Sequence, residues 1–398
     1  MTHVLQDITV IDLTQAMAGP YCTMLLGDMG AEVIKIERPG QGEQSRGWGP
    51  PFVEGESAYF LSVNRNKKSL TLNIGAPEGQ TILRRLVAGA DVFVCNIPRR
   101  ASRERAGVDA ATLLALNPRL IYATITGYGV TGPYADRPGY DMVAQGEAGL
   151  MSLTGAPDPN GEPYRYPIPM ADITTGLYAT IGILGALYAR QQTGAGQTLD
   201  LSLLESQTAW ASIVAGSYLN AGLTPARMGN DHPTIVPYQV FPAKDKYIIV
   251  AVGTEKLWAA FCRELDLTRL QHDPRFATNA DRIAHRAEIT ALLSEHFKTQ
   301  PAGYWLEKLR RAGIPNGPIN RIPEAMAHPQ HRARNFVVEL EHPLAGVVKS
   351  LGNPVNFSDT GVSYRLPPPL LGEHTARILA GLNYTPAQIE RLRQNGVV

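Results

Sequence analysis

The chain has 398 residues, of which 44% are hydrophobic and 18% are charged, a balance typical of a folded protein rather than a disordered or fibrous one. Lys and Arg together number 37 against 36 for Asp and Glu, so the charge balance favours neither nucleic acid nor a membrane surface as a partner. A chain of this length exceeds the size at which one hydrophobic core stops growing, so we expect two domains.

The cysteines and the first residues indicate the compartment. Cys22, Cys95 and Cys262 are odd in number and widely spaced, which fits neither a disulfide framework nor a metal site. Residues 1–7 lack the basic region and the apolar stretch of a signal peptide. The longest weakly polar run, 176–189, is shorter than a membrane span. We therefore expect a cytoplasmic protein with no metal site and no membrane segment.

Strand and helix patterns alternate through the first half of the chain. Apolar strands are predicted at 8–13, 31–36, 69–72, 92–95 and 120–125, and helices at 20–29, at 77–90 and up to 113–117. This alternation predicts an α/β fold with a parallel sheet covered by helices on both faces. The large domain is thus expected to be Rossmann-like, with ligands at the carboxyl ends of its strands. A polar loop at 39–55 contains Arg46 and Trp48, and its length is typical of functional or mobile loops.

One motif imitates a dinucleotide-binding site. Gly127, Gly129 and Gly132 match the pattern G-x-G-x-x-G after a predicted strand. That pattern holds a pyrophosphate only when it opens a helix, whereas residues 133–139 are predicted to form a loop. The first strand–helix turn, 14–19, also lacks the motif, so an NAD-dependent oxidoreductase is a remote alternative.

The second half of the chain changes character after residue 196. The patterns predict a strand at 198–204, a helix at 205–219, a loop at 220–237, a β-hairpin at 238–241 and 247–252, and a breaker at 314–319. We therefore predict a large domain from residues 1–200 and 330–398, a smaller α/β domain at 225–325, and linkers at 201–224 and 326–345.

The segment 169–176 contains the carboxylate around which the chain is organised. Asp172 lies where a proline-containing extended segment turns into the apolar helix predicted at 176–189. Aspartate is a preferred N-cap, and its charge suits the positive end of a helix, so a structural cap is one interpretation. A catalytic carboxylate is the other interpretation, and the motifs along the rest of the chain favour it.

These motifs together resemble the class III CoA-transferases, a family that also includes the α-methylacyl-CoA racemases. The resemblance extends over nearly the whole chain and is carried by Ile11-Asp12-Leu13, Ala18-Gly19-Pro20, residues 33–37, 139–145, 169–176 and 369–375. It implies that Asp172 is the nucleophile and that the protein is an interlocked homodimer. Residues 235–241 and 367–372 look most like the branch that uses succinyl-CoA and dicarboxylic acids such as glutarate, itaconate, citramalate or malate.

The chemistry implied by this resemblance is covalent. Asp172 would attack the donor thioester to give a mixed anhydride, the released thiolate would form an aspartyl-CoA thioester, and the acceptor acid would reverse the sequence. Oxyanions formed on the way need backbone N–H donors, for which Gly229 and Gly253 are candidates. An acceptor with a second carboxylate needs a cation, which Arg165 or Arg46 could supply.

The resemblance also implies how the co-substrate, a coenzyme A thioester, is held, and no tightly bound cofactor is expected. The implied contacts come from Arg38, Leu72, Asn96, Arg105, Tyr140 and Asp141. Arg105 is offset by one residue from the family pattern, so Arg103 or Arg100 could take its role. Met17 stands where the family often has glutamine, although Gln15 lies nearby.

Two rival functions remain open at this point. A racemase of the same fold needs a base near neutral pKa, and this chain has Tyr140 where racemases carry histidine. Transfer is therefore the favoured reaction, with Asp141 and Glu147 as alternative acids. A non-enzymatic CoA-binding or scaffold protein is the remote alternative of another class.

Overall fold

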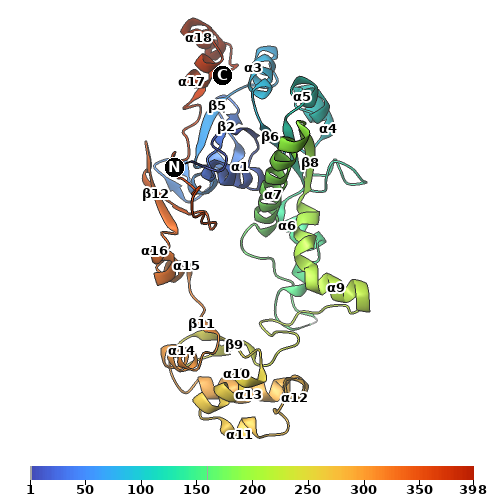
Figure 1. Cartoon of the computed structure of the whole chain (residues 1–398), viewed down its shortest axis with the longest axis vertical. Helices are drawn as coiled ribbons and strands as arrows, with labels where there is room; N and C mark the ends of the chain where they lie inside the picture. Colours follow the sequence, from blue (N-terminus) through green and yellow to red (C-terminus); the bar gives the residue numbers. More distant parts are fainter. Residues whose placement is uncertain (1, 159) are drawn as a thin grey trace. The chain divides into compact units, whose positions relative to one another are not determined.

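The computed structural model of the chain describes residues 2–158 and 160–398. The chain divides into two compact units (Figure 1). The large unit comprises the chain up to Met151, Arg165–Thr224 and Gln330–Val398, and the small unit comprises Ser152–Tyr164 and Pro225–Pro329. The segment 152–164 therefore belongs with the small unit, although the sequence places it in the large domain.

The large unit is built on a six-stranded sheet with the order β5-β2-β1-β6-β7-β8. Its strands are β1 Thr9–Leu13, β2 Glu32–Glu37, β5 Lys67–Thr71, β6 Val92–Cys95, β7 Ile121–Thr126 and β8 Gln197–Ser202. Every pair is parallel, with Ile11 aligned to Ile34 on one side and to Phe93 on the other. The strand order reverses between β1 and β6, which is the place where open α/β sheets bind ligands. The predicted Rossmann-like α/β fold is confirmed.

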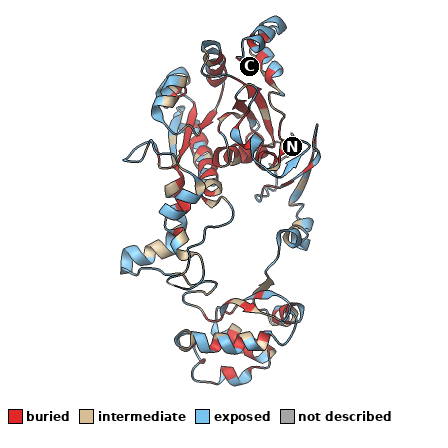
Figure 2. Cartoon of the chain, turned by 180° about the vertical axis from the view of Figure 1, so that it is seen from behind, coloured by how far each residue is buried: buried red, intermediate tan, exposed pale blue. Residues whose placement is uncertain are grey.

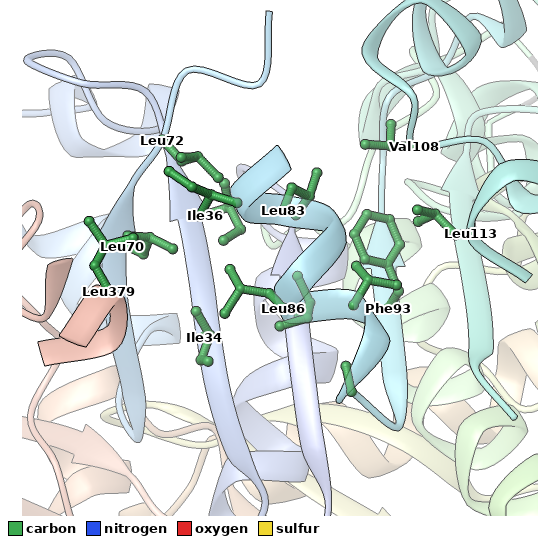
Figure 3. Close-up of a cluster of buried hydrophobic side chains, with 14 of the residues drawn as sticks. Ile34, Ile36, Leu70, Leu72, Leu83, Leu86, Phe93, Val108, Leu113 and Leu379 are labelled. Carbon is green, nitrogen blue, oxygen red and sulfur yellow. The ribbon is translucent and has the colours of Figure 1, made fainter. Parts of the chain in front are cut away.

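Alternate side chains of these strands enter two separate cores, because successive residues of a strand point to opposite faces. On one face, Ile34, Ile36, Leu70 and Phe93 pack with Leu83 and Leu86 of α3 (Pro77–Ala88), as Figure 3 shows. This face is also covered by α5 (Ala110–Leu116), α17 (Thr375–Gly381) and α18 (Pro386–Gln394). On the other face, Val10, Val33, Val92 and Val94 pack against α1 (Ala18–Asp28) and α7 (Met170–Thr193).

Helix α7 begins earlier and ends later than predicted, so it runs over Met170–Thr193 rather than 176–189. Its close packing on α1 depends on Gly176, where an added Cβ would lie 2.7 Å from the carbonyl oxygen of Ala18. By length and composition α7 would suffice to cross a membrane, as many core helices of soluble proteins would, and half of its apolar window is buried in the structure. The early start places Asp172 inside the first helical turn.

The predicted linkers contain regular structure. The single helix predicted at 205–219 is replaced by α8 (Leu203–Thr208), a 3-10 turn at Ala209–Ala211 and α9 (Ser212–Ala221). Figure 2 shows that α9 is largely exposed, in contrast to the central strands of the sheet. The second linker contains α16 (Pro329–Ala333) and the strand β12 (Val337–His342), which pairs with β13 (Gly346–Leu351).

The small unit packs helices against a three-stranded antiparallel sheet in the order β11-β10-β9. The strands are β9 Tyr238–Pro242, β10 Tyr247–Ala251 and β11 Asn316–Pro318, so the predicted hairpin is present and the breaker at 314–319 holds a short strand. Its helices are α10 Glu255–Glu264, α11 Thr268–Gln271, α12 Asn279–Ala284, α13 Arg286–Phe297, α14 Ala302–Arg311 and α15 Ile322–Met326. Their core contains Phe241, Phe261, Phe297 and Trp305.

Candidate active site

A pocket of about 560 Å³ lies at the carboxyl ends of β1, β2, β5 and β6, beside the point where the strand order reverses. Arg38, Leu72 and Asn96, which the sequence assigns to CoA, all line it. Arg38 is exposed, and its guanidinium forms no ion pair or hydrogen bond with any of residues 2–158 and 160–398. An arginine in that state can bind phosphate oxygens through its planar fork of N–H donors.

The loop after β1 forms one wall of this pocket and is fixed residue by residue. Thr14 donates its N–H to Asp12, and Lys35 donates to the Thr14 carbonyl over 2.9 Å. The side chain of Asn96 accepts the Gln15 N–H at 3.2 Å and donates to the Gln15 carbonyl at 2.8 Å. Ala16 takes a left-handed φ of 68°, so the loop holds a strained residue in place. Asn96 thus shapes the pocket wall.

The loop after β2 forms the opposite wall and is anchored by buried charges. Glu37 accepts two donors of the Arg46 guanidinium, at 2.7 and 2.8 Å, and the N–H of Glu43 at 3.1 Å. Although burial acts to raise it, these donors and the charge of Lys35 hold the pKa of Glu37 below its usual range. Arg46 also donates to the Pro369 carbonyl and lies over the Phe60 ring. Its donors are therefore committed inside the large unit, which favours Arg165 over Arg46 as the cation for the acceptor.

The arginines of α4 (Arg100–Ala106) lie beyond the pocket wall. Arg105 is exposed and is absent from the residues that line the pocket. Arg103 is buried and donates to the carbonyls of Ile97 and Pro98, while Arg100 pairs with Glu104. Arg103 and Arg100 therefore support the chain around the pocket, and a phosphate contact from Arg105 stays a prediction.

Asp172 lies in the first turn of α7, whose N-cap residue is Pro169. Burial, with the nearby negative charge of Asp141, raises the pKa of Asp172 from 3.8 to about 7. The part of the chain that the structure describes shows no hydrogen bond or ion pair to its carboxylate. Asp172 is therefore not the N-cap of α7, although its charge still lies at the positive end of the helix. Its carboxylate is partly buried and has no partner among the described residues. A carboxylate in that state is a stronger base and nucleophile than a solvated one.

Two residues near Asp172 were not found from the sequence. The first is Tyr59, on α2 (Ala58–Val63), whose pKa is raised by burial and by the charges of Asp172, Glu43 and Asp141. Its ring also contacts Trp48 edge-on at 5.0 Å. The second is Gln145, which is fully buried on α6 (Asp141–Glu147). Tyr59 and Asp172 belong to segments far apart in the sequence, and Gln145 also contacts the segment 166–168, so no local pattern indicated either residue.

The remaining predicted residues take separate positions. Tyr140 precedes α6 and is 70% exposed, whereas Asp141 accepts the backbone N–H groups of Ala171 and Asp172. Arg165 is exposed in the large unit and donates to the Tyr166 carbonyl. Gly229 and Gly253 belong to the small unit, and Gly229 has a left-handed φ of 61°. No cluster of acidic, histidine or cysteine side chains suited to a metal occurs among the residues that the structure describes.

The G-x-G-x-x-G segment opens no helix in the structure. Residues after Gly132 run as turns and coil until α6 begins at Asp141. Gly127 instead lies against Gly139, and a Cβ on Gly127 would come within 2.6 Å of the Gly139 Cα. These glycines therefore allow two stretches of backbone to approach each other.

Comparison with known proteins gives a consistent assignment. The model of "CoA-transferase family III" matches residues 5–375. A succinyl-CoA:glutarate CoA-transferase of Homo sapiens is 44% identical over 99% of this chain and 90% of its own length. A succinate–glutarate CoA-transferase of Agrobacterium fabrum is 41% identical over 95% of each chain. The crystal structure of a CaiB/BaiF family protein from Brucella suis superposes with a TM-score of 0.87 at 41% identity, covering 96% of this chain and all of its own.

The fold, the pocket and the desolvated carboxylate agree with this match. The six-stranded parallel sheet places a pocket at its switch point, and the aspartate that the motifs single out is held at the start of a core helix. The chain therefore belongs to CoA-transferase family III and is a CoA-transferase.

Proposed function

We propose that this enzyme moves CoA from succinyl-CoA to a dicarboxylic acid of the glutarate class, with Asp172 as the covalent carrier. One observation carries the proposal: Asp172 is the partner-free, desolvated carboxylate in the first turn of α7, with a pKa raised to about 7. The glutarate-using relatives, each more than 40% identical to this chain, support the choice of substrates.

The proposed reaction begins with attack by a carboxylate oxygen of Asp172 on the thioester carbonyl of the donor. The C–S bond breaks, CoA leaves as a thiolate, and a mixed anhydride joins Asp172 to the succinyl group. The thiolate then attacks the aspartyl carbonyl, which releases succinate and leaves CoA on Asp172 as a thioester. The acceptor carboxylate repeats these steps in reverse order, so that each bond broken is replaced by one of similar energy.

The pocket at the switch point is the proposed site for the nucleotide part of CoA. Arg38 offers an unpaired guanidinium there, Leu72 offers apolar contact, and Asn96 keeps the loop at Gln15 in position. The wall after β1 leads directly into α1, against which α7 packs through Gly176. The pocket wall after β1 and the helix that carries Asp172 are therefore linked through α1 within the large unit. This link would hold the thioester near Asp172.

The acceptor requires a cation for its second carboxylate, and Arg165 is the better of the two candidates. Its guanidinium is exposed and donates only to the Tyr166 carbonyl in the described contacts, at 3.3 Å. Arg46 is bound to Glu37 and to the Pro369 carbonyl. A free arginine fork can bind a carboxylate through two hydrogen bonds.

We also propose that the enzyme is a homodimer, as its family resemblance implies. Two helices of the large unit expose large apolar side chains that a partner could cover: Ile181 and Tyr188 on α7, and Ile213 and Leu219 on α9. Ile213 is 84% exposed and Leu219 is 77% exposed, so a partner that covered α9 would remove apolar area from water.

The central test replaces the nucleophile. Asp172→Asn and Asp172→Ala are expected to lower transfer from succinyl-CoA to glutarate by several orders of magnitude, because no other group can form the anhydride. Glu78→Gln is the matched control, since Glu78 is an exposed acid in the first turn of α3. Trapping with hydroxylamine during turnover should convert Asp172 to a hydroxamate, located by peptide mass. Label on Asp141 or Glu147 instead would assign the nucleophile to that residue.

A further inference from the structure

The side chain of Gln145 is fully buried, and both of its polar atoms form hydrogen bonds to residues around the proposed nucleophile, Asp172. Its Nε2 donates to Oδ2 of Asp141 at 2.7 Å and to the Ile168 carbonyl at 3.4 Å. Its Oε1 accepts the N–H of Tyr166 at 2.9 Å. The side chain therefore ties α6 to the segment 166–168, which leads directly into α7.

Asp141 continues this chain of contacts to Asp172. Its Oδ1 accepts the N–H of Ala171 at 2.7 Å and the N–H of Asp172 itself at 3.4 Å. These are first-turn N–H groups, which have no partner within the helix, and the N-cap residue Pro169 supplies no side-chain bond. The start of α7 is thus capped by a side chain from another helix, α6. One of the two N–H groups that this cap binds belongs to the proposed nucleophile.

The same contacts bring a second negative charge close to the nucleophile. The Gln145 donor and the two backbone N–H groups hold the Asp141 carboxylate beside the first turn of α7. An ionised Asp141 raises the pKa of Asp172, in addition to the larger effect of burial. Among the described residues, Tyr59 on α2 also lies close enough to feel the charge of Asp172, and its raised pKa keeps it uncharged near pH 7 and well above.

We propose that Gln145 is a positioning residue for CoA transfer. By holding Asp141 against the start of α7 and the segment 166–168 against α6, it sets the direction and the basicity of the Asp172 carboxylate. This inference rests on the proposed role of Asp172, and it gives Asp141 a positioning function through its contacts to α7.

The test uses three single variants, one double variant and one matched control. Gln145→Met keeps the side-chain length but removes both the donor and the acceptor, Gln145→Glu keeps the acceptor and adds negative charge beside Asp141, and Asp141→Asn removes the charge. Gln394→Glu is the control, because Gln394 donates to Glu390 four residues earlier on α18, the same pairing as Gln145 with Asp141 but on an exposed helix.

Gln145→Met is expected to lower kcat about 10- to 100-fold with KM for succinyl-CoA little changed, because the pocket is untouched and the nucleophile is misdirected. In the double variant with Asp141→Asn, the further loss should be less than threefold, since the two side chains act as one unit. Gln394→Glu should behave as wild type. A double variant whose kcat loss equals the product of the two single losses would overturn the proposal. A kcat of Gln145→Met within twofold of wild type would also overturn it.

The pH profile separates positioning from loss of folding. Activity requires ionised Asp172, so kcat/KM for succinyl-CoA should rise with pH through about 7 in the wild type. This limb should move to lower pH in Asp141→Asn and to higher pH in Gln145→Glu, and this readout remains if Gln145→Met does not fold. Identical limbs in all three enzymes would overturn the proposal. Hydroxylamine labelling of wild-type Asp172 is measured in parallel, and its absence would reject the proposed function rather than the role of Gln145.

Discussion

Asp172 occupies a position that destabilises its own charge. Its carboxylate is desolvated, faces a second carboxylate and accepts no hydrogen bond recorded within the described ranges, so the protein holds it at a cost to folding. Asp12, by contrast, is fully buried but accepts donors from Thr14, Thr23 and Lys67, and its pKa is lowered despite its burial. This difference in hydrogen-bond partners is the one expected between a structural acid and the nucleophile that we propose.

The stability of the protein is expected to depend on pH through Asp172. The folded pKa, about 7, lies above the value of 3.8 expected when unfolded, so the folded state binds the proton more tightly between these values. The associated stability is present below pH 4 and is lost as pH rises through 7. Asp172→Asn should therefore unfold at a higher temperature than wild type at pH 8, with a gain of up to about 4 kcal/mol, since each pH unit is worth about 1.4 kcal/mol.

Thermal unfolding of both proteins from pH 4.5 to pH 8 checks this expectation. The difference in melting temperature should be small at low pH and should grow through neutrality, while Glu78→Gln follows the wild type. A difference that is constant with pH would mean that the charge of Asp172 is not the cause.

Arg165 is expected to govern the choice of acceptor. Arg165→Ala should weaken dicarboxylate acceptors by about 2 kcal/mol, the usual loss for a charged hydrogen bond, and leave monocarboxylates little changed. The measurement is kcat/KM for glutarate and for a monocarboxylate of equal length, with Arg377→Ala on the exposed face of α17 as control. Equal losses for both acids would remove Arg165 from the acceptor site.

Among the elements, the sheet was predictable and the surroundings of the nucleophile were not. All six strands of the main sheet were predicted from their own sequence, and the central ones carry apolar side chains on both faces because two cores cover them. The strand β12, which lies outside this sheet, was not predicted. The start of α7 was missed because Pro169 and the residues before it read as extended chain, while the cap comes from Asp141, about 30 residues earlier in the sequence. The break between α8 and α9 falls at Ala209–Ala211, where no proline or glycine marks it.

The pocket was predictable in place and only partly in detail. Ligand binding at the carboxyl ends of the strands follows from the βαβ pattern, and Arg38, Leu72 and Asn96 were identified through family motifs. Lys35 and Glu43, which support its walls, were not identified, because a lysine inside an apolar strand gives no sign of its partners. Gly396 also lines the pocket, and the packing of α18 places it there.

Lys35 is expected to hold the two walls of the pocket together. Lys35 lies on β2, and its side chain is fully buried. Its Nζ donates to the Thr14 carbonyl and, at 3.0 Å, to Glu43. Lys35→Met should therefore cost about 3 kcal/mol or more in stability, since Glu43 would stay buried without its partner, and should raise KM for succinyl-CoA. Denaturant unfolding and CoA titration measure the two effects.

Lys68→Met on the neighbouring strand supplies the comparison, because its pair with Glu32 is partly exposed. An exposed pair contributes about 0–1 kcal/mol. Equal losses in the two variants would show that Lys35 is not a structural bridge between the walls.

On the scale of the whole molecule, the large unit is assembled from three separate stretches of the chain. The family resemblance implies that two such chains interlock, so separation of the subunits would require unfolding. Tagged and untagged dimers mixed under native conditions should therefore form no mixed dimers over days, while mixing after denaturation and refolding should produce them. Rapid exchange measured by affinity capture and native mass would contradict interlocking.

Residues of the last stretch of the large unit, Gln330–Val398, form hydrogen bonds with residues of its first stretch. Asp28 and Arg65 form a buried ion pair, and Arg65 also donates to the Leu351 carbonyl. Asn66 accepts the N–H groups of Arg365 and Leu366. Until those residues leave the ribosome, the N-terminal strands have a sheet without its final supports and an open face that α17 and α18 will later cover. A nascent chain therefore stays incompletely packed until residues 351–394 have been synthesised, and chaperones that shield apolar surface can act in that interval.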